Sequence, residues 1–472
     1  MKPAILWFRR NLRLHDNLAL CAAAGSGRPV VAVYISDTLD AGGASRWWLH
    51  HSLSSLDAGL KEHGAGLIVR SGDPVAVLPG LVEATGAESV FFSRRYEPDA
   101  RSQEQALEDA LDDSCELCGI DDSLIRHPDS VMTGAGTPYK VFTPFWKAAS
   151  GHGDPERPAS RPAELATTTA GLDTGDIDDL ELLPTRPDWA GGLRDTWTPG
   201  EDGAFERLDA ACEIASDYDE DRDRPDIDGT SRLSPHLHFG ELSPRQVWHD
   251  IHSAAPPSGR KGVDALLRQL YWRDFSAYLL YHFPRLPDEP LRGEFKDFPW
   301  TEDPEGLKAW QSGKTGYPIV DAGMRQLWET GWMHNRVRMI VASFLVKDLL
   351  VHWQAGADWF LDTLVDADLA NNSASWQWVA GCGTDAAPYF RIFNPVLQGK
   401  KFDPMGDYVR RWVPELERLP AKLIQEPWKM DLDQQKAANV IIGEDYPAPI
   451  VDHGEARDLA LQAYRAIRKQ DG

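Results

Sequence analysis

The sequence predicts an α/β domain followed by an all-helical domain. Short apolar runs alternate with amphipathic segments over the first 130 residues, which is typical of a parallel sheet. Residues 151–200 are rich in Pro, Gly, Thr and Asp and show little periodicity, whereas residues after 204 follow a helical repeat. We therefore expect an α/β domain with a Rossmann-like parallel sheet at 1–130, a long linker at 131–203 and a helical domain at 204–472.

The expected strands of the first domain are four apolar runs, at residues 5–8, 30–34, 67–69 and 90–92. Continuous apolar runs of this length suit strands that are buried on both faces. Helix-like segments lie between them, for example at 47–63 and 101–111. Because no Gly-x-Gly-x-x-Gly motif opens any of these helices, we do not expect a dinucleotide site in this domain.

Two segments of the second domain carry polar side chains on a helix face. The segment 332–350 has an apolar core stripe, and Asn335, Arg338 and Met339 lie away from that stripe. The segment 263–283 places Gln269, Trp272, Arg273 and Ser276 on one face. An outward Trp beside an Arg and amides indicates either a helix–helix contact or the wall of a ligand site.

Two polar stretches border these helices. The run Thr230-Ser231-Arg232-Leu233-Ser234 comes just before an expected helix, so it is either an N-cap or a cradle for a phosphate group. Asp366 and Asp368 lie in an expected loop between two apolar helices. Carboxylates there, near Arg-bearing helices, suggest a buried ion pair that organises a site.

Composition excludes some classes of protein. The chain has 49 Lys and Arg against 73 Asp and Glu, and its net charge of −24 disfavours indiscriminate binding to nucleic acid. A local basic and aromatic patch is still present around residues 388–393, with Arg391, Lys400 and Lys401. No apolar run is long enough for a membrane span or fits a signal peptide, so we expect a cytoplasmic protein.

The five cysteines do not form a disulfide framework, which agrees with a reducing compartment. Cys115-x-x-Cys118 has no second pair, so we interpret it as a surface thiol pair and expect no metal site.

Four motifs together identify a family. The motifs are WFRRNLRLHDN at 7–17, GTSRLS at 229–234, GWMHNR at 331–336 and DAAPYFRIFNP at 385–395. With these motifs the sequence resembles the photolyase/cryptochrome family over residues 4 to about 465, and it is most similar to bacterial photolyases that repair cyclobutane pyrimidine dimers. The resemblance implies an antenna-binding α/β domain and a helical domain that binds FAD and DNA.

The resemblance also implies which residues contact the flavin. These are Tyr218, Thr230, Ser231, Arg232, Leu233, Ser234, Arg273, Arg338, Asp366, Asp368 and Asn372. The hydroxyl run would then meet the pyrophosphate, and Arg338 would pair with Asp366. Asn372 would lie beside flavin N5, where plant cryptochromes carry an Asp, and this difference favours repair over signalling.

Further roles follow from the same resemblance. Trp376, Trp353 and Trp300 match the electron-transfer triad that reduces the photoexcited flavin. Contacts to UV-damaged DNA are implied for Arg222, Gln269, Trp272, Asn335, Arg336, Met339, Trp378 and Arg391, with Trp272 and Trp378 stacking on the flipped dimer. The implied reaction is light-driven repair of cyclobutane pyrimidine dimers, in which excited FADH⁻ gives an electron to the dimer.

The sequence departs from the family pattern at Gln269, where dimer photolyases usually carry Glu, so we expect slower repair. This departure keeps open a cryptochrome-like blue-light receptor with weak or no repair. Histidines typical of (6-4) photolyases are replaced by Asn335 and Met339, which argues against that substrate.

The identity of the antenna chromophore stays open: it is 5,10-methenyltetrahydrofolate or 8-hydroxy-5-deazaflavin, or there is none. We expect a monomer.

Overall fold

The computed structural model describes residues 1–37, 42–111, 115–254, 256–385 and 390–468. Residues 386–389 of the fourth motif therefore lie outside the described residues. The chain forms two compact units. The first unit comprises Met1–Asp219, Ser231–Pro284 and Val365–Ala370, and the second comprises Glu220–Thr230, Arg285–Leu364 and Asn371–Gly472.

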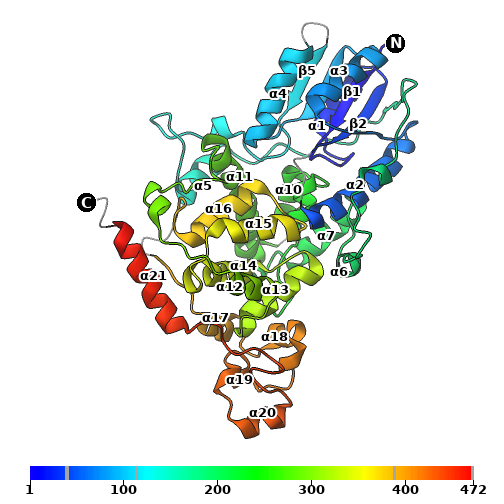
Figure 1. The fold of residues 1–472 in the computed structure, drawn as a ribbon. Helices are drawn as coiled ribbons and strands as arrows, with labels where there is room; N and C mark the ends of the chain where they lie inside the picture. The colour runs from blue at the N-terminus through cyan, green and yellow to red at the C-terminus, as the bar shows by residue number, and fades with distance from the viewer. Residues whose placement is uncertain (38–41, 112–114, 255, 386–389, 469–472) are drawn as a thin grey trace. The chain divides into compact units, whose positions relative to one another are not determined.

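A five-stranded sheet forms the core of the α/β part of the first unit (Figure 1). Its strands are β1 (Ala4–Phe8), β2 (Val30–Ser36), β3 (Ile68–Ser71), β4 (Ser89–Ser93) and β5 (Glu116–Ile120). They are all parallel, in the order β3-β2-β1-β4-β5, and Ile5 of β1 pairs with both Val31 and Val90. The parallel α/β fold is confirmed.

Strand β5 was not expected from the sequence, and it corrects the interpretation of the cysteine pair. Cys115 is buried and belongs to the hydrophobic core together with Leu107 and Leu111, while Cys118 is half-buried within β5. Burial raises the pKa of both thiols to about 11. Cys118 is thus part of an edge strand and Cys115 a core residue just before it, so they are not a surface thiol pair. The sequence does not predict β5, because Glu116 and Gly119 interrupt its apolar run.

Helices cover both faces of the sheet, and every residue of β1 is therefore buried. One face packs against apolar side chains of α3 (Pro74–Thr85) and α4 (Pro98–Leu111). Helix α1 (Leu18–Gly25) lies against β1, β4 and β5, and α2 (Gly43–Lys61) follows β2. Asn17 caps α1 by accepting a hydrogen bond from the Leu20 amide at 2.9 Å.

The segment expected as a linker contains ordered structure. It includes α5 (Phe142–Ser150) and α6 (Gly191–Thr196). It also bonds to the sheet, since the Val30 amide donates to the Ala166 carbonyl at 2.8 Å and the Val69 amide to the Thr174 carbonyl at 2.7 Å. The domain boundaries at 130 and 203 stay a prediction.

The remaining elements are helical. The first unit continues with α7 (Glu201–Ile214), α9 (Ser234–Phe239), α10 (Pro244–Ala254) and α11 (Arg260–His282). The second unit contains α12 (Pro304–Gln311), α13 (Pro318–Thr330), α14 (Asn335–Ser343), α15 (Trp353–Thr363), α17 (Pro395–Phe402), α18 (Asp407–Trp412), α19 (Ala421–Ile424), α20 (Leu432–Ala438) and α21 (His453–Arg468) (Figure 1). Two helices, α8 (Tyr218–Asp221) and α16 (Leu369–Ala380), each contribute residues to both units.

The helix expected at 332–350 is shorter than predicted, and its last part is a π-helix. It begins at Asn335 because His334 has an extended backbone and its ring nitrogen accepts the Arg336 amide at 3.1 Å, which is an N-cap. It ends at Ser343, and a π-helical turn follows (Phe344–Asp348). Such turns are frequent at functional sites.

The C-terminal end of α9 forms hydrogen bonds with the motif at residues 7–17. The Leu12 amide donates to the Phe239 carbonyl at 3.1 Å, and Arg13 donates to the Gly240 carbonyl at 2.9 Å. Gly240 ends α9 with φ +67°, and a Cβ there would lie 2.1 Å from the Arg10 carbonyl oxygen. Gly240 therefore allows two segments of the first unit to approach closely.

Gly240→Ala should lower the free energy of unfolding by about 3 kcal/mol, because left-handed strain and a backbone clash add together. Gly86→Ala is the matched control: Gly86 also ends a helix at φ +65°, but no atom lies within 4 Å of its added Cβ. The control should lose only about 1 kcal/mol. Urea unfolding of both variants measures the difference, and equal losses would contradict the close approach.

Candidate active site

The hydroxyl run of the second motif does not cap a helix. Helix α9 begins at Ser234, its N-cap is Leu233, and no side chain makes a capping hydrogen bond. The Ser234 hydroxyl instead donates to Asp366 Oδ2 at 2.6 Å. Arg232 has φ +51°, a left-handed conformation that is rare outside glycine and is typical of functional sites. The N-cap interpretation is therefore wrong, and a ligand cradle remains.

Two acidic side chains approach α9 from the loop between α15 and α16. Asp366 accepts the Ser234 hydroxyl, and Asp368 lies 3.7 Å from the His238 ring nitrogen. The loop itself was predicted. Arg273 reaches the same helix from α11, where it donates to the Leu237 carbonyl at 3.3 Å. The first unit thus brings Ser234, Arg273, Asp366 and Asp368 together around α9.

A buried carboxylate fixes the position of Arg273. The next residue, Asp274, is buried and accepts hydrogen bonds from the Ile125 amide at 2.9 Å and the Arg126 amide at 3.0 Å. Burial raises the pKa of Asp274 to about 7 despite these bonds. Arg273 also donates to the Ser123 carbonyl at 2.7 Å. The segment 123–126 therefore anchors α11, which the sequence did not reveal.

The polar face of α11 carries two predicted substrate contacts. Gln269 donates from its side-chain amide to the Ala265 carbonyl of its own helix at 2.9 Å. Trp272 is 36% exposed, and its ring stacks on Phe142 of α5 with centroids 3.6 Å apart and planes 8° apart. One face of the Trp272 ring is thus covered by protein while more than a third of the side chain remains exposed.

Other expected flavin contacts belong to the second unit. Arg338 donates from Nε to the Met333 carbonyl at 2.8 Å. Asn372 is buried, and its Nδ2 donates to the Ala357 carbonyl at 3.0 Å, which orients its carboxamide. Thr230 is also in the second unit, whereas the half-buried Ser231 and Arg232, buried Leu233 and buried Tyr218 are in the first. The Arg338–Asp366 pair stays a prediction.

The three expected electron-transfer tryptophans all lie in the second unit, and they differ in burial. Trp376 and Trp353 are almost fully buried, and Trp300 is half-buried. His352 lies between the outer two, 5.1 Å from the Trp300 ring and 5.6 Å from the Trp353 ring. The Trp376 ring lies on the backbone of α15, because a Cβ at Gly356 would meet it at 2.1 Å. This arrangement suits a relay from surface to core.

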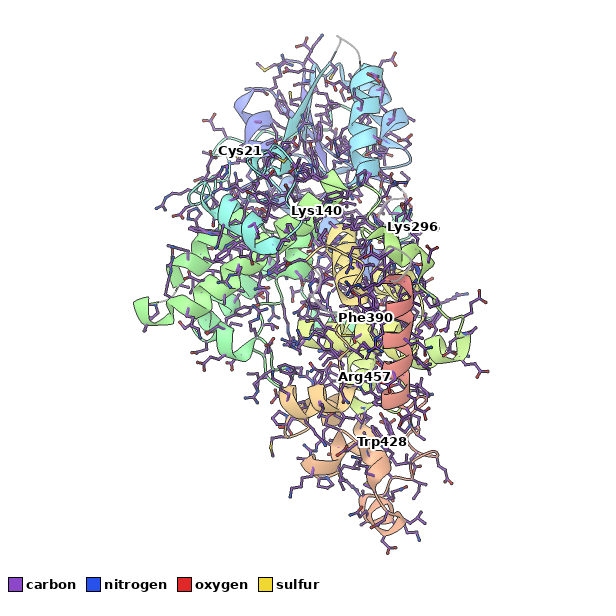
Figure 2. The ribbon with its side chains drawn as sticks, turned by 90° about the vertical axis from the view of Figure 1, so that its left-hand side faces the viewer. Cys21, Lys140, Lys296, Phe390, Trp428 and Arg457 are labelled. Atoms are coloured by element: carbon purple, nitrogen blue, oxygen red, sulfur yellow. The ribbon has the colours of Figure 1, made fainter. Side chains whose placement is uncertain are left out.

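Two predicted DNA contacts line the same small hollow in the second unit. Trp378 and Arg391 line it together with Lys347 and Phe390. The buried Lys347 ammonium donates to the Ala380 carbonyl, which ends α16, at 2.9 Å and lies 3.0 Å from the centre of the Phe390 ring (labelled in Figure 2). Burial lowers the pKa of Lys347 well below its usual range. Lys347 therefore holds the helix end that carries Trp378.

The remaining residues predicted to contact DNA differ in exposure and in the contacts they already make within the protein. Asn335 is exposed and Met339 is half-buried, both on α14. Arg336 is engaged, since it pairs with Asp223 at 2.8 Å and lies over Phe402. Lys400 of the expected basic patch pairs with Glu426, Lys401 lies over Phe402, and Arg222 is half-buried. Their roles on DNA phosphates stay predictions.

The residues around α9 fit FAD. Hydroxyls, an Arg in a left-handed conformation and the Arg273 guanidinium provide hydrogen-bond donors suited to a pyrophosphate. Asp366 and Asp368 provide acceptors for ribose or ring N–H groups. In the described ranges, His, Cys, Asp and Glu side chains do not gather in threes as a metal site requires. Nor does any helix there have the length and apolarity of a membrane span.

Residues 96–101, which follow β4, make several contacts within the first unit. The Tyr96 hydroxyl donates to Asp121 at 2.8 Å, and Arg101 lies 4.0 Å over the Tyr281 ring. Glu97 pairs with Arg95 at 3.0 Å. Burial acts to raise the pKa of Glu97, but the charges of Arg95 and Arg10 and the hydrogen bond from Arg95 together outweigh it and hold the pKa at about 2. These contacts do not select an antenna.

Two family models match the chain: "DNA photolyase" over residues 4–163 and "FAD binding domain of DNA photolyase" over residues 266–466. A deoxyribodipyrimidine photo-lyase of Agrobacterium fabrum is 49% identical over 99% of this chain and 98% of its own length. Cryptochrome-1 of Arabidopsis thaliana is 38% identical over 96% of this chain and 69% of its own. The crystal structure of a class III photolyase from Agrobacterium tumefaciens is 48% identical, with a TM-score of 0.97 over 99% of this chain and 98% of that one.

Proposed function

Because the chain belongs to the DNA photolyase family, we propose that it is a deoxyribodipyrimidine photo-lyase, which uses light to split cyclobutane pyrimidine dimers in DNA. The single observation that carries this proposal is the Trp272 ring, which is backed by Phe142 on one side and remains 36% exposed. An aromatic ring presented in this way is a platform for a base that has left its duplex.

The proposed division of labour follows from the residues around this platform. Bound FAD, when reduced, supplies the electron that splits the dimer, and the protein positions the partners. Ser234, Arg273, Asp366 and Asp368 hold the cofactor, and Trp272 and Trp378 stack on the extruded dimer. Burial of Asn372 and its bond to Ala357 keep a neutral carboxamide at the place proposed for flavin N5.

A cryptochrome-like photoreceptor is the second candidate, and one observation favours it. The side-chain amide of Gln269 donates to Ala265 of its own helix, so one of its two N–H groups is already used. A Glu at this position would offer two acceptors to a reduced pyrimidine, and a Gln offers one. We therefore propose repair that is slower than in relatives with Glu. A monomer in the cytoplasm and an antenna chromophore also stay predictions.

The first experiment is repair of an oligonucleotide that contains one thymine dimer, by protein whose FAD has been reduced, in blue light and in darkness. Recovery of base absorbance in the ultraviolet follows the return of the unsaturated pyrimidine rings. We expect recovery in light only. If FAD is bound and reduced and no base absorbance returns, the repair function is contradicted and the cryptochrome-like photoreceptor becomes the favoured hypothesis.

A second prediction concerns Trp300, the half-buried member of the three tryptophans. Trp300→Phe should slow photoreduction of oxidised FAD about tenfold or more, because Phe is much harder to oxidise than Trp. Repair by variant protein that was reduced chemically beforehand should be unchanged. Flavin absorbance under blue light and the oligonucleotide assay provide the two readouts. Loss of repair in the pre-reduced variant would contradict a relay role.

A further inference from the structure

The Trp272 ring rests on a residue that the sequence assigned to the linker. Phe142 opens α5 and is 4% exposed, and its ring lies parallel to that of Trp272. A centroid distance of 3.6 Å with planes 8° apart is a face-to-face contact with little offset. Aromatic pairs usually prefer offset or edge contacts. The arrangement is therefore set by the surrounding structure and not by the pair alone.

Contacts on either side of Phe142 set the register of α5 on α11. Just before α5, the Tyr139 amide donates to the Tyr278 hydroxyl at 2.8 Å, and Lys140 (labelled in Figure 2) lies 5.3 Å from the centre of the Phe283 ring. One turn into α5, Phe145 packs on Phe275 at 5.0 Å. Helix α5 cannot slide along α11 without breaking these contacts, so the Phe142 ring is held in place.

We propose that Phe142 is a positioning residue for damaged DNA, which keeps the Trp272 ring turned outward so that its second face can stack on the extruded dimer. An unsupported Trp on a helix surface would fold down onto neighbouring apolar groups and cover that face. Phe142 occupies the place into which the ring would fold. The inference rests on the proposed function, because it needs Trp272 to stack on substrate.

A purely structural role for Phe142 predicts a different result from a positioning role. If Phe142 only packs α5 on α11, its loss lowers stability and leaves selectivity for the dimer unchanged. If it positions Trp272, its loss also lowers the preference for damaged over undamaged DNA, and an aromatic replacement restores that preference.

The test is a double-mutant cycle of Phe142→Leu and Trp272→Ala, with binding of one labelled oligonucleotide measured with and without a thymine dimer. Phe142→Leu should weaken dimer binding by about threefold to tenfold, the usual contribution of an aromatic pair, and leave binding of undamaged DNA unchanged. In the Trp272→Ala background it should have no further effect. Phe142→Tyr should restore the preference.

Phe145→Leu is the matched control, because Phe145 is buried on the same helix and contacts Phe275 and Tyr278. It should lower the melting temperature and leave dimer preference intact. The same loss of preference in the control, or equal effects of Phe142→Leu with and without Trp272, would overturn the positioning role. If Trp272→Ala itself leaves dimer binding unchanged, the proposed stacking function fails instead.

A different contact carries a second inference on the same pair of helices. Arg268 lies one turn before Trp272, and its guanidinium lies 4.5 Å over the Trp146 ring of α5. Among the described residues it has no ion-pair partner, and its buried Nε has no hydrogen-bond partner. Residues four apart share a helix face. We infer that Arg268 binds a DNA phosphate next to the nucleotide on Trp272.

Salt dependence of binding tests this contact directly. Each phosphate that a cation neutralises adds about 0.9 to the slope of log K against log salt on duplex DNA. Arg268→Gln should lower the slope by about 0.9 for the dimer oligonucleotide. Arg260→Gln is the control, since exposed Arg260 is on the same helix but pairs with Asp264 at 3.2 Å. An unchanged slope for Arg268→Gln, or an equal drop in both variants, would overturn the inference.

Discussion

Buried charge is the constraint on which much of the first unit depends. The N-terminal motif takes several ionic side chains out of water, which is tolerated only where each finds a partner. Arg13 pairs with Asp122 at 3.1 Å, with almost no exposure on either side, and Asp16 pairs with Arg245 of α10 at 2.7 Å. Arg9 pairs with Glu104 of α4, although burial still lowers the pKa of Arg9 to about 10. These pairs tie the segment after β1 to α4, to α10 and to the residues that follow β5.

This constraint gives the first motif a structural meaning. Its residues were recognised as a family signature, and their contacts lie with helices that carry the site and not with the site itself. Arg10 meets His238, which in turn lies beside Asp368, so the motif supports the helix that begins at Ser234. The geometry of the proposed cofactor cradle therefore depends on hydrogen bonds that the motif forms at the far end of α9.

The sequence predicted the parallel sheet because fully buried strands must be continuously apolar, and β1, β2 and β4 satisfy this rule. It missed β5, an edge strand that tolerates Glu116 and Gly119, and it missed α5, which begins among prolines and glycines. A signal for α5 was present: Phe142, Phe145 and Trp146 recur at helical spacing. The polar face of α11 was predicted, but its partner was not, because side-chain spacing says nothing about which segment covers a helix.

Net charge explains why stacking has to carry so much of the proposed recognition. A chain at −24 repels DNA over long distances, and several of its cations are neutralised by neighbours, such as Arg336 by Asp223 and Lys400 by Glu426. Undamaged duplex offers only phosphates and stacked bases, so it gains little on such a surface. A dimer, which stacks poorly in its duplex, can leave it at low cost and gain a ring contact. Under the proposed function, an acidic surface with a rigid aromatic platform discriminates lesions because it disfavours undamaged DNA.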